Sequence, residues 1–137
     1  MSEQQNTNLV QQAYENFKSG NIEALLSLIS DDVEWQLPEV ESIPFTGKRK
    51  GLESIGQFFA QVGDAQDVLQ FEPGLYIAQG EKVAVQGHYA WRVKANGRSY
   101  ESDFAHVFTL RNGKIVGFQE YFDTAVAAAA YQKAQSA

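Results

Sequence analysis

Two Asn-Gly dipeptides divide the second half of this sequence into long runs of alternating apolar and polar residues. Asn96-Gly97 and Asn112-Gly113 each stand between two such runs. Asn-Gly between alternating segments is a strong sign of a β-hairpin, because both residues accept the backbone angles of its tight turn. We therefore expect an antiparallel meander, with Pro73-Gly74 and Gly80-Glu81 as further turns. The expected strands cover residues 68–72, 75–79, 82–93, 98–110 and 114–123.

The first half of the sequence has helical spacing instead. Apolar residues between Leu9 and Phe17 recur every three or four positions, and Gly20 is a natural stop for this helix. Asn21 can cap a second short helix over residues 22–29, which Ser30-Asp31-Asp32 ends. A first strand is expected at 33–37, a Pro- and Gly-containing loop up to 51, a third helix at 52–62 and a closing helix at about 124–135.

Helices followed by a meander indicate the α+β class, here a curved antiparallel sheet with helices over one face. At 137 residues we expect a single domain, 1–137, that buries a real core. The sequence has no cysteine, which excludes a disulfide framework and thiolate chemistry. With a net charge of −6 and no basic stripe, neither nucleic acid nor a membrane is an expected partner. A polar N-terminus and the lack of a membrane-length apolar run favour a cytoplasmic protein.

The first hairpin predicts which residues of its two strands face each other. A two-residue loop at Asn96-Gly97 pairs Tyr89 with Phe104 and Gly87 with His106. The missing side chain at Gly87 then leaves a gap in the inner layer opposite His106, which could admit a ligand or let a helix approach.

The second hairpin needs a different loop. Two residues at Asn112-Gly113 would place the apolar faces on opposite sides, so we expect three, Arg111–Gly113, with Gly113 left-handed and a bulge beside it. His106 then opposes Phe118 and becomes a diagonal neighbour of Glu120, within side-chain reach.

Glu120 and His106 are each the single ionisable residue on the apolar face of their strand. A carboxylate on such a face must be compensated or protonated, and a neighbouring imidazole can do either. The two residues are therefore a candidate acid/base pair, with a purely structural hydrogen-bonded pair as the alternative. No spacing of further ligands supports a metal site around them, and we expect no cofactor.

Other features have structural interpretations. Asp123 lies beyond the last strand, where it can cap the final helix, and His88 falls on the outer face of the sheet. That outer face carries few charges, so we expect a second copy of the chain to cover it in a homodimer. Its apolar members are Ala84, Ala90, Ala105, Val107, Ile115 and Tyr121.

Several segments carry a family resemblance. They are Phe17–Leu25, Asp31–Trp35, Gly51, His106–Phe108, Asn112–Ile115 and Glu120–Ala125. Together they resemble the NTF2-like superfamily and, within it, the SnoaL-like, ketosteroid-isomerase-related branch. The resemblance covers nearly the whole chain and implies a cone of curved sheet packed against N-terminal helices around one apolar pocket, usually in a dimer. It is a poor guide to function, because this fold hosts isomerases, hydrolases, cyclases, dehydratases and binders.

Known catalytic sets of the superfamily transfer only in part. Leu37 resembles the position of the general-base Asp of ketosteroid isomerase, and Tyr14 lies one residue from the position of its oxyanion-hole Tyr. The Asp-Arg-Asp trio of limonene-type epoxide hydrolase is retained only as Glu120. The polyketide cyclases have an Asp at the position of Glu120 and a His resembling His106, and this arrangement is kept here with Glu for Asp.

We therefore expect a pocket that binds a small, mostly apolar, carbonyl-bearing molecule. As an enzyme it would be an isomerase, cyclase or dehydratase, in which Glu120 moves a proton and His106 binds the oxyanion or orients Glu120. The alternatives are a non-catalytic ligand carrier and a dimeric assembly module. The expected pocket lining, besides the pair, is Tyr14, Trp35, Leu37, Phe58, Phe59, Gly87, Tyr89, Trp91, Phe104, Phe108, Phe118 and Phe122.

Overall fold

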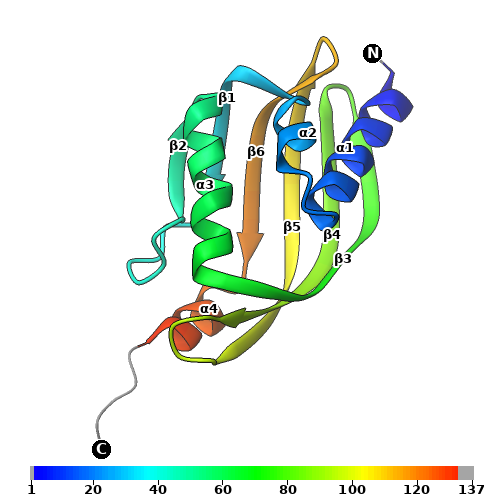
Figure 1. Cartoon of the computed structure of the whole chain (residues 1–137). Coiled ribbons are helices and arrows are strands. Elements are labelled where there is room, and N and C mark those ends of the chain that lie inside the picture. The colour runs from blue at the N-terminus through cyan, green and yellow to red at the C-terminus, as the bar shows by residue number, and fades with distance from the viewer. Residues whose placement is uncertain (1, 133–137) are drawn as a thin grey trace, which may run out of the picture.

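A computed structural model of the chain describes residues 2–132. Three helices cover one face of a curved six-stranded sheet, and a fourth lies at one end of it, which confirms the expected α+β class (Figure 1). The elements are α1 (Glu3–Lys18), α2 (Ile22–Leu26), β1 (Ile29–Leu37), β2 (Gly47–Lys50), α3 (Leu52–Ala65), β3 (Gln66–Gln79), β4 (Lys82–Val93), β5 (Ser99–Arg111), β6 (Lys114–Phe122) and α4 (Thr124–Tyr131).

The strands follow the order β2-β1-β6-β5-β4-β3 across the sheet. Neighbouring strands are antiparallel, as expected, except that β1 and β6 run parallel. The inner face of the sheet and the apolar faces of α1 and α3 enclose the core (Figure 1).

Local capping chemistry sets the helix ends. Ser2 and Gln5 form a capping box at the start of α1, and Asn21 and Asp123 cap α2 and α4 through backbone N–H groups. Gly20, with a φ of +76°, lies directly after α1 and its C-cap, in the left-handed conformation that glycine favours. The expected stop and both expected caps are confirmed. The part of the closing helix expected at 133–135 lies outside the described residues.

Three expected element boundaries are wrong. The second helix ends at Leu26, and Ile29 instead begins β1, because apolar spacing over so short a segment fits a helix and a strand equally. β2 lies in a segment expected to be a loop. The strands expected at 68–72 and 75–79 are one strand, β3, which passes Pro73-Gly74 with a register shift instead of a turn. As an edge strand, β3 tolerates a proline that lacks an N–H.

The loop between β4 and β5 is longer than the two residues expected. It spans residues 94–97, and only Gly97 of the Asn-Gly pair has a positive φ. The Asn96 side chain accepts a hydrogen bond from Arg98 N–H (2.9 Å) and donates one to the Ala130 carbonyl on α4 (2.8 Å). These contacts with its own turn and with a distant helix favour a wider turn.

This longer loop moves the register by two residues. Gly87 lies opposite Phe104, not His106, and His106 lies opposite Val85. The Phe104 ring fills the expected gap, since a Cβ on Gly87 would lie 2.5 Å from Phe104 Cζ and 2.6 Å from the Glu72 backbone oxygen. Gly87 therefore permits close packing of a ring and offers no space to a ligand.

The loop between β5 and β6 has two residues, not the expected three. Asn112 and Gly113 both have positive φ, +54° and +76°, and the strands pair directly on either side of them. The positive φ at Gly113 is confirmed. A register shift beyond the turn leaves Val116 as an extra residue between Ile115 and Gly117, and this bulge restores agreement between the apolar faces.

The bulge decides which side chains of β6 face the helices. Ile115 points into the core, where it is 1% exposed, and not onto the outer face as expected. Farther along β6, Glu120 lies directly opposite His106, closer than the expected diagonal, and Phe118 lies opposite Phe108.

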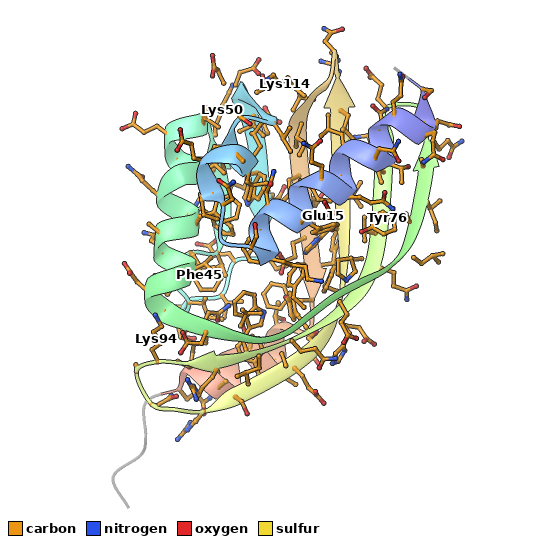
Figure 2. All side chains as sticks on the ribbon, turned by 45° about the vertical axis from the view of Figure 1, so that its right-hand side comes forward. Glu15, Phe45, Lys50, Tyr76, Lys94 and Lys114 are labelled. Atoms are coloured by element: carbon orange, nitrogen blue, oxygen red, sulfur yellow. The ribbon has the colours of Figure 1, made fainter. Side chains whose placement is uncertain are left out.

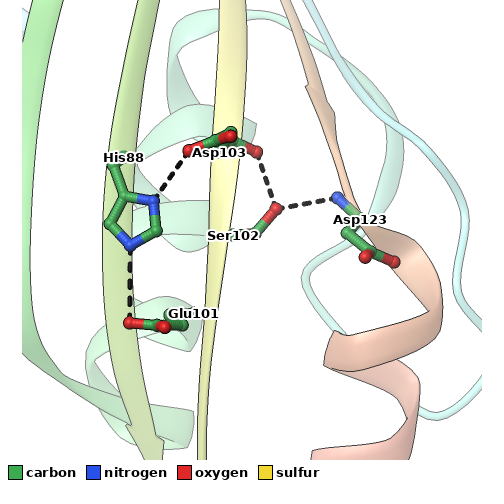
Figure 3. A network of polar contacts seen from close by, with 5 residues as sticks. All are labelled: His88, Glu101, Ser102, Asp103 and Asp123. Atoms are coloured by element: carbon green, nitrogen blue, oxygen red, sulfur yellow. Dashed lines mark hydrogen bonds and ion pairs between the residues drawn. The ribbon is translucent and has the colours of Figure 1, made fainter.

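A polar network occupies one end of the outer sheet face (Figure 3). His88 lies there as expected, with Nδ1 2.8 Å from Asp103 Oδ1 and Nε2 3.5 Å from Glu101 Oε2. The hydrogen bond with Asp103 is the largest cause of a raised pKa of His88; desolvation opposes it less strongly, and the hydrogen bond with Glu101 adds a smaller rise. Beside them, Ser102 Oγ accepts the Asp123 N–H (2.9 Å) and so ties the start of α4 to β5.

Gly87→Ala should destabilise the protein by about 1–3 kcal/mol, because the new Cβ would overlap a buried ring and a backbone oxygen. Gly63→Ala is the matched control. Gly63 lies in α3 with nothing within 4 Å of a new Cβ, so alanine there should stabilise the helix by about 0.5–1 kcal/mol. Urea unfolding measures both changes. A Gly87→Ala protein as stable as wild type would contradict the close packing of Phe104.

His88 should titrate above its ordinary pKa of about 6.5, and Asp103→Asn should lower this pKa more than Glu101→Gln. A raised folded-state pKa gives stability that is present below the unfolded value and is lost as pH rises through the folded value. His88→Gln should therefore lose more stability at about pH 5.5 than at about pH 8.5. NMR titration and denaturation at both pH values test this; a pKa at or below the ordinary value, or a pH-independent loss, would refute it.

Candidate active site

A cavity of about 90 Å³ lies between the helices and the inner face of the sheet. Its wall is largely aromatic, and rings fill the space between the helices and the sheet, with Phe45 among them (Figure 2). His106 and Glu120 both belong to this wall. Of the other residues expected to line it, the cavity contacts Tyr14, Trp35, Leu37, Phe58, Phe59, Tyr89, Trp91, Phe108, Phe118 and Phe122.

Gly87 and Phe104 were expected in the lining and do not belong to it. The register shift places the Phe104 ring over Gly87, where it stacks on Phe71 and on the His106 imidazole, with ring centroids 5.5 Å and 4.2 Å apart. The Phe104 ring therefore covers one face of the imidazole.

His106 and Glu120 meet in the cavity wall. His106 Nε2 lies 3.2 Å from Glu120 Oε1, and their side chains are 5% and 12% exposed. The contact has the length of an ion pair, yet its direction is not that of a hydrogen bond, so within residues 2–132 Nε2 has no hydrogen-bond partner. A buried nitrogen without a partner carries a free-energy cost that a small movement of Glu120, or a ligand, would relieve.

Tyr14 holds the other side of the imidazole. It lies on the buried face of α1 with Val10 and Ala13, and its hydroxyl oxygen is 2.7 Å from His106 Nδ1. Burial, with smaller contributions from Tyr76 and Glu120, raises the pKa of Tyr14 far above its ordinary value, so the phenol keeps its proton. A phenol that donates to Nδ1 leaves the proton of a neutral imidazole on Nε2, the atom that faces Glu120.

Tyr89 holds the carboxyl group in the same way. Its hydroxyl donates a hydrogen bond to Glu120 Oε2 (2.6 Å). Burial and then the nearby Glu120 charge raise the pKa of Tyr89, which therefore stays a donor. Tyr14, His106, Glu120 and Tyr89 thus form a continuous polar chain through an apolar wall, with α1, β5, β6 and β4 each supplying one member.

A second polar cluster in the cavity was not predicted. Gln66 is 4% exposed, and its Oε1 accepts hydrogen bonds from the hydroxyls of Tyr100 (2.9 Å) and Tyr131 (2.5 Å). Alternation along β5 directs Tyr100 inward, so its position could have been predicted. Gln66 could not have been predicted, because it lies where α3 meets β3 and belongs to the apolar pattern of neither element. The other lining residues absent from the expected set are Ala13, Phe17, Leu25, Ile29, Ile43, Phe45, Val62, Phe71 and Ile115.

Trp35 adds an unpaired donor. Its ring stacks on Phe118 with centroids 4.0 Å apart, and its buried Nε1 has no hydrogen-bond partner in the described part of the chain. Among residues 2–132, no three His, Cys, Asp or Glu side chains are grouped so that they could hold a metal ion. None of the described helices has the length and apolar character to cross a membrane.

Comparisons with known proteins agree with this architecture. The sequence matches the SnoaL-like domain family over residues 10–118, whereas no curated protein matches it. The structure is similar to that of an NTF2-like protein from Burkholderia xenovorans LB400, which is 30% identical. The match covers 96% of this chain and 99% of the other, with a TM-score of 0.88.

Two further solved structures are similar over nearly their whole length. An NTF2-like protein of unknown function from Burkholderia pseudomallei K96243 is 27% identical, with 97% of this chain and 100% of that chain covered and a TM-score of 0.85. TerC, co-crystallised with polyporic acid, is 28% identical, with 94% and 99% covered and a TM-score of 0.84. The family match over most of the sequence and the shared fold together show that this chain belongs to the SnoaL-like domain family, with the NTF2-like fold.

Proposed function

We propose that the cavity binds a small, mostly apolar, carbonyl-bearing molecule and that Glu120 and His106 act on it as an acid/base pair. The observation that carries the proposal is the pair itself: a carboxyl group and an imidazole 3.2 Å apart in an aromatic wall, each held by a tyrosine. The reaction class is isomerisation, cyclisation or dehydration that needs only proton transfer.

Glu120 is the member of the pair that meets the ligand. Its side chain is more exposed than that of His106, at 12% against 5%. Glu120 takes a proton from the carbon next to the ligand carbonyl, the electron pair moves onto the carbonyl oxygen as an enolate, and the proton returns at a second atom. His106 acts through Glu120: its Nε2 contacts the carboxyl group and orients it. The Tyr14 hydroxyl holds the imidazole in place through Nδ1.

Relatives support a ligand of this kind without identifying it. TerC, 28% identical to this chain, was crystallised with polyporic acid. The sequence departs from the catalytic set of ketosteroid isomerase, because Leu37 lines the cavity where the resemblance would require a carboxylate. Steroid-type isomerisation is therefore not proposed.

The incomplete retention of the superfamily's known catalytic sets favours one second candidate, a non-catalytic ligand carrier. An apolar cavity of about 150 Å³ can hold benzene, so the 90 Å³ here takes only a small molecule unless the rings of the wall move. In a carrier, the polar chain from Tyr14 to Tyr89 would only anchor an oxygen of the ligand. A carrier binds ketones without exchanging their protons, and this difference separates the two candidates.

We further propose a homodimer through the outer sheet face. Leu75, Ile77 and Tyr121 are 54%, 58% and 50% exposed there, beside partly buried Ala105 and Val107. Lys48, Lys50 and Lys82 line a groove at one end of this face, and Glu101 and Asp103 lie at the other. A two-fold axis through the middle brings the basic end of one copy against the acidic end of the other.

Glu120→Gln should leave the melting temperature unchanged or raise it, because removing a buried charge relieves its desolvation. The same change should slow deuterium exchange at the α-carbons of 2-tetralone, a ketone probe, by at least about 100-fold, the contribution of a general base. Glu41→Gln, at an exposed loop position, is the control and should alter neither property.

A structural role for the pair predicts the reverse pattern. Removal of the charge would then cost about 1–3 kcal/mol by leaving a partner unsatisfied. A melting temperature several degrees lower, with 2-tetralone exchange unchanged, would overturn the catalytic proposal.

Val107→Glu should split the proposed dimer, because each copy would bury a carboxylate near the two-fold axis. Val126→Glu is the matched control, since Val126 lies on α4, away from the outer sheet face, and is 37% exposed. Sedimentation should give twice the chain mass for wild type and for the control, and one chain mass for Val107→Glu. A wild-type mass of one chain at micromolar concentration would rule the dimer out.

A further inference from the structure

We infer that Gln66 is a second ligand-binding residue, whose side-chain amide donates a hydrogen bond to an acceptor oxygen of the bound molecule. This inference rests on the proposed function, since it concerns the same cavity. It narrows the ligand class to apolar molecules that carry a second oxygen function, such as a carbonyl or ether, apart from the carbonyl that Glu120 acts on.

Two phenols fix the orientation of the Gln66 amide. The hydroxyls of Tyr100 and Tyr131 lie 2.9 Å and 2.5 Å from the same oxygen, Oε1. Burial raises the pKa of both tyrosines, so both keep their protons and both donate. An amide oxygen has two lone pairs, and here the two hydroxyls use both of them.

The nitrogen of the same amide is left without an acceptor. No oxygen among residues 2–132 accepts a hydrogen bond from Gln66 Nε2, although Gln66 is 4% exposed and lines the cavity. An amide nitrogen carries two N–H donors, and an oxygen of a ligand in the cavity can accept a hydrogen bond from them.

The amide lies close to the acid/base pair. Gln66, Tyr100, His106 and Glu120 line one cavity, and the Glu120 charge is one of the smaller causes that raise the pKa of Tyr100. Three elements hold the cluster, because Gln66 begins β3, Tyr100 lies on β5 and Tyr131 ends α4. A ligand whose carbonyl group faces Glu120 therefore contacts Gln66 with a different part of the molecule.

Two probes of nearly equal shape test this assignment. Methoxyacetone carries an ether oxygen besides its carbonyl, and 2-pentanone has a methylene group in the place of that ether oxygen. In ¹⁵N-labelled wild-type protein, methoxyacetone should shift the side-chain NH₂ signals of Gln66 downfield, and 2-pentanone should not. Gln66→Met identifies these signals by their loss. It should also reduce the preference for methoxyacetone over 2-pentanone by about fivefold, which corresponds to one neutral hydrogen bond. Gln79→Met, at an exposed position of β3, is the control and should keep the preference.

The outcomes separate this inference from the proposed function. If both probes bind but move the Gln66 signals equally, the amide only ties α4 to the sheet; the inference fails and the proposed function stands. If neither probe binds in the cavity, both fail. If Gln66→Met does not fold, the signals of the wild-type protein still decide the question.

Discussion

The bulge at Val116 is the feature on which the candidate site depends. The tight turn at Asn112-Gly113 would by itself direct the apolar side chains of β6 away from the helices. One extra residue reverses their direction, and Glu120 comes to face His106 across the β5–β6 pair. A one-residue slip would place the carboxyl group on the outer face and leave the imidazole without it. The local geometry of one strand thus brings a carboxyl group and an imidazole together in the interior.

The surroundings of the pair explain how it persists in an apolar wall. A buried polar group is tolerated when its partners are in place, and here the partners come from separate elements. The hydroxyl of Tyr14, on α1, is hydrogen-bonded to His106, and the hydroxyl of Tyr89, on β4, donates a hydrogen bond to Glu120. Phe104 packs against the imidazole ring from the same strand. The contact between the two central groups is the least satisfied one, as expected where binding or chemistry takes place.

Sequence alternation and capping residues predicted the helices, most strands and the proximity of His106 and Glu120, because these depend on local periodicity. They could not predict the register of either hairpin. The β4–β5 loop is lengthened by contacts of Asn96, one of them with the distant helix α4, and the β5–β6 parity is restored within the strand and not in the turn. Gly87 and Phe104 were wrongly assigned to the cavity lining because the expected β4–β5 register was wrong. Gln66 was missed because its importance comes from two tyrosines distant in sequence.

The central claim is that Tyr14, His106 and Glu120 form one directed chain, in which Nδ1 accepts and Nε2 faces the carboxyl group. The most direct measurement is the ¹⁵N spectrum of the two histidine side chains at about pH 8.5, where neutral tautomers are distinct. The account predicts that His106 carries its proton on Nε2 and that Tyr14→Phe removes this preference. A proton on Nδ1 in the wild-type protein, or a tautomer unaffected by Tyr14→Phe, would contradict it.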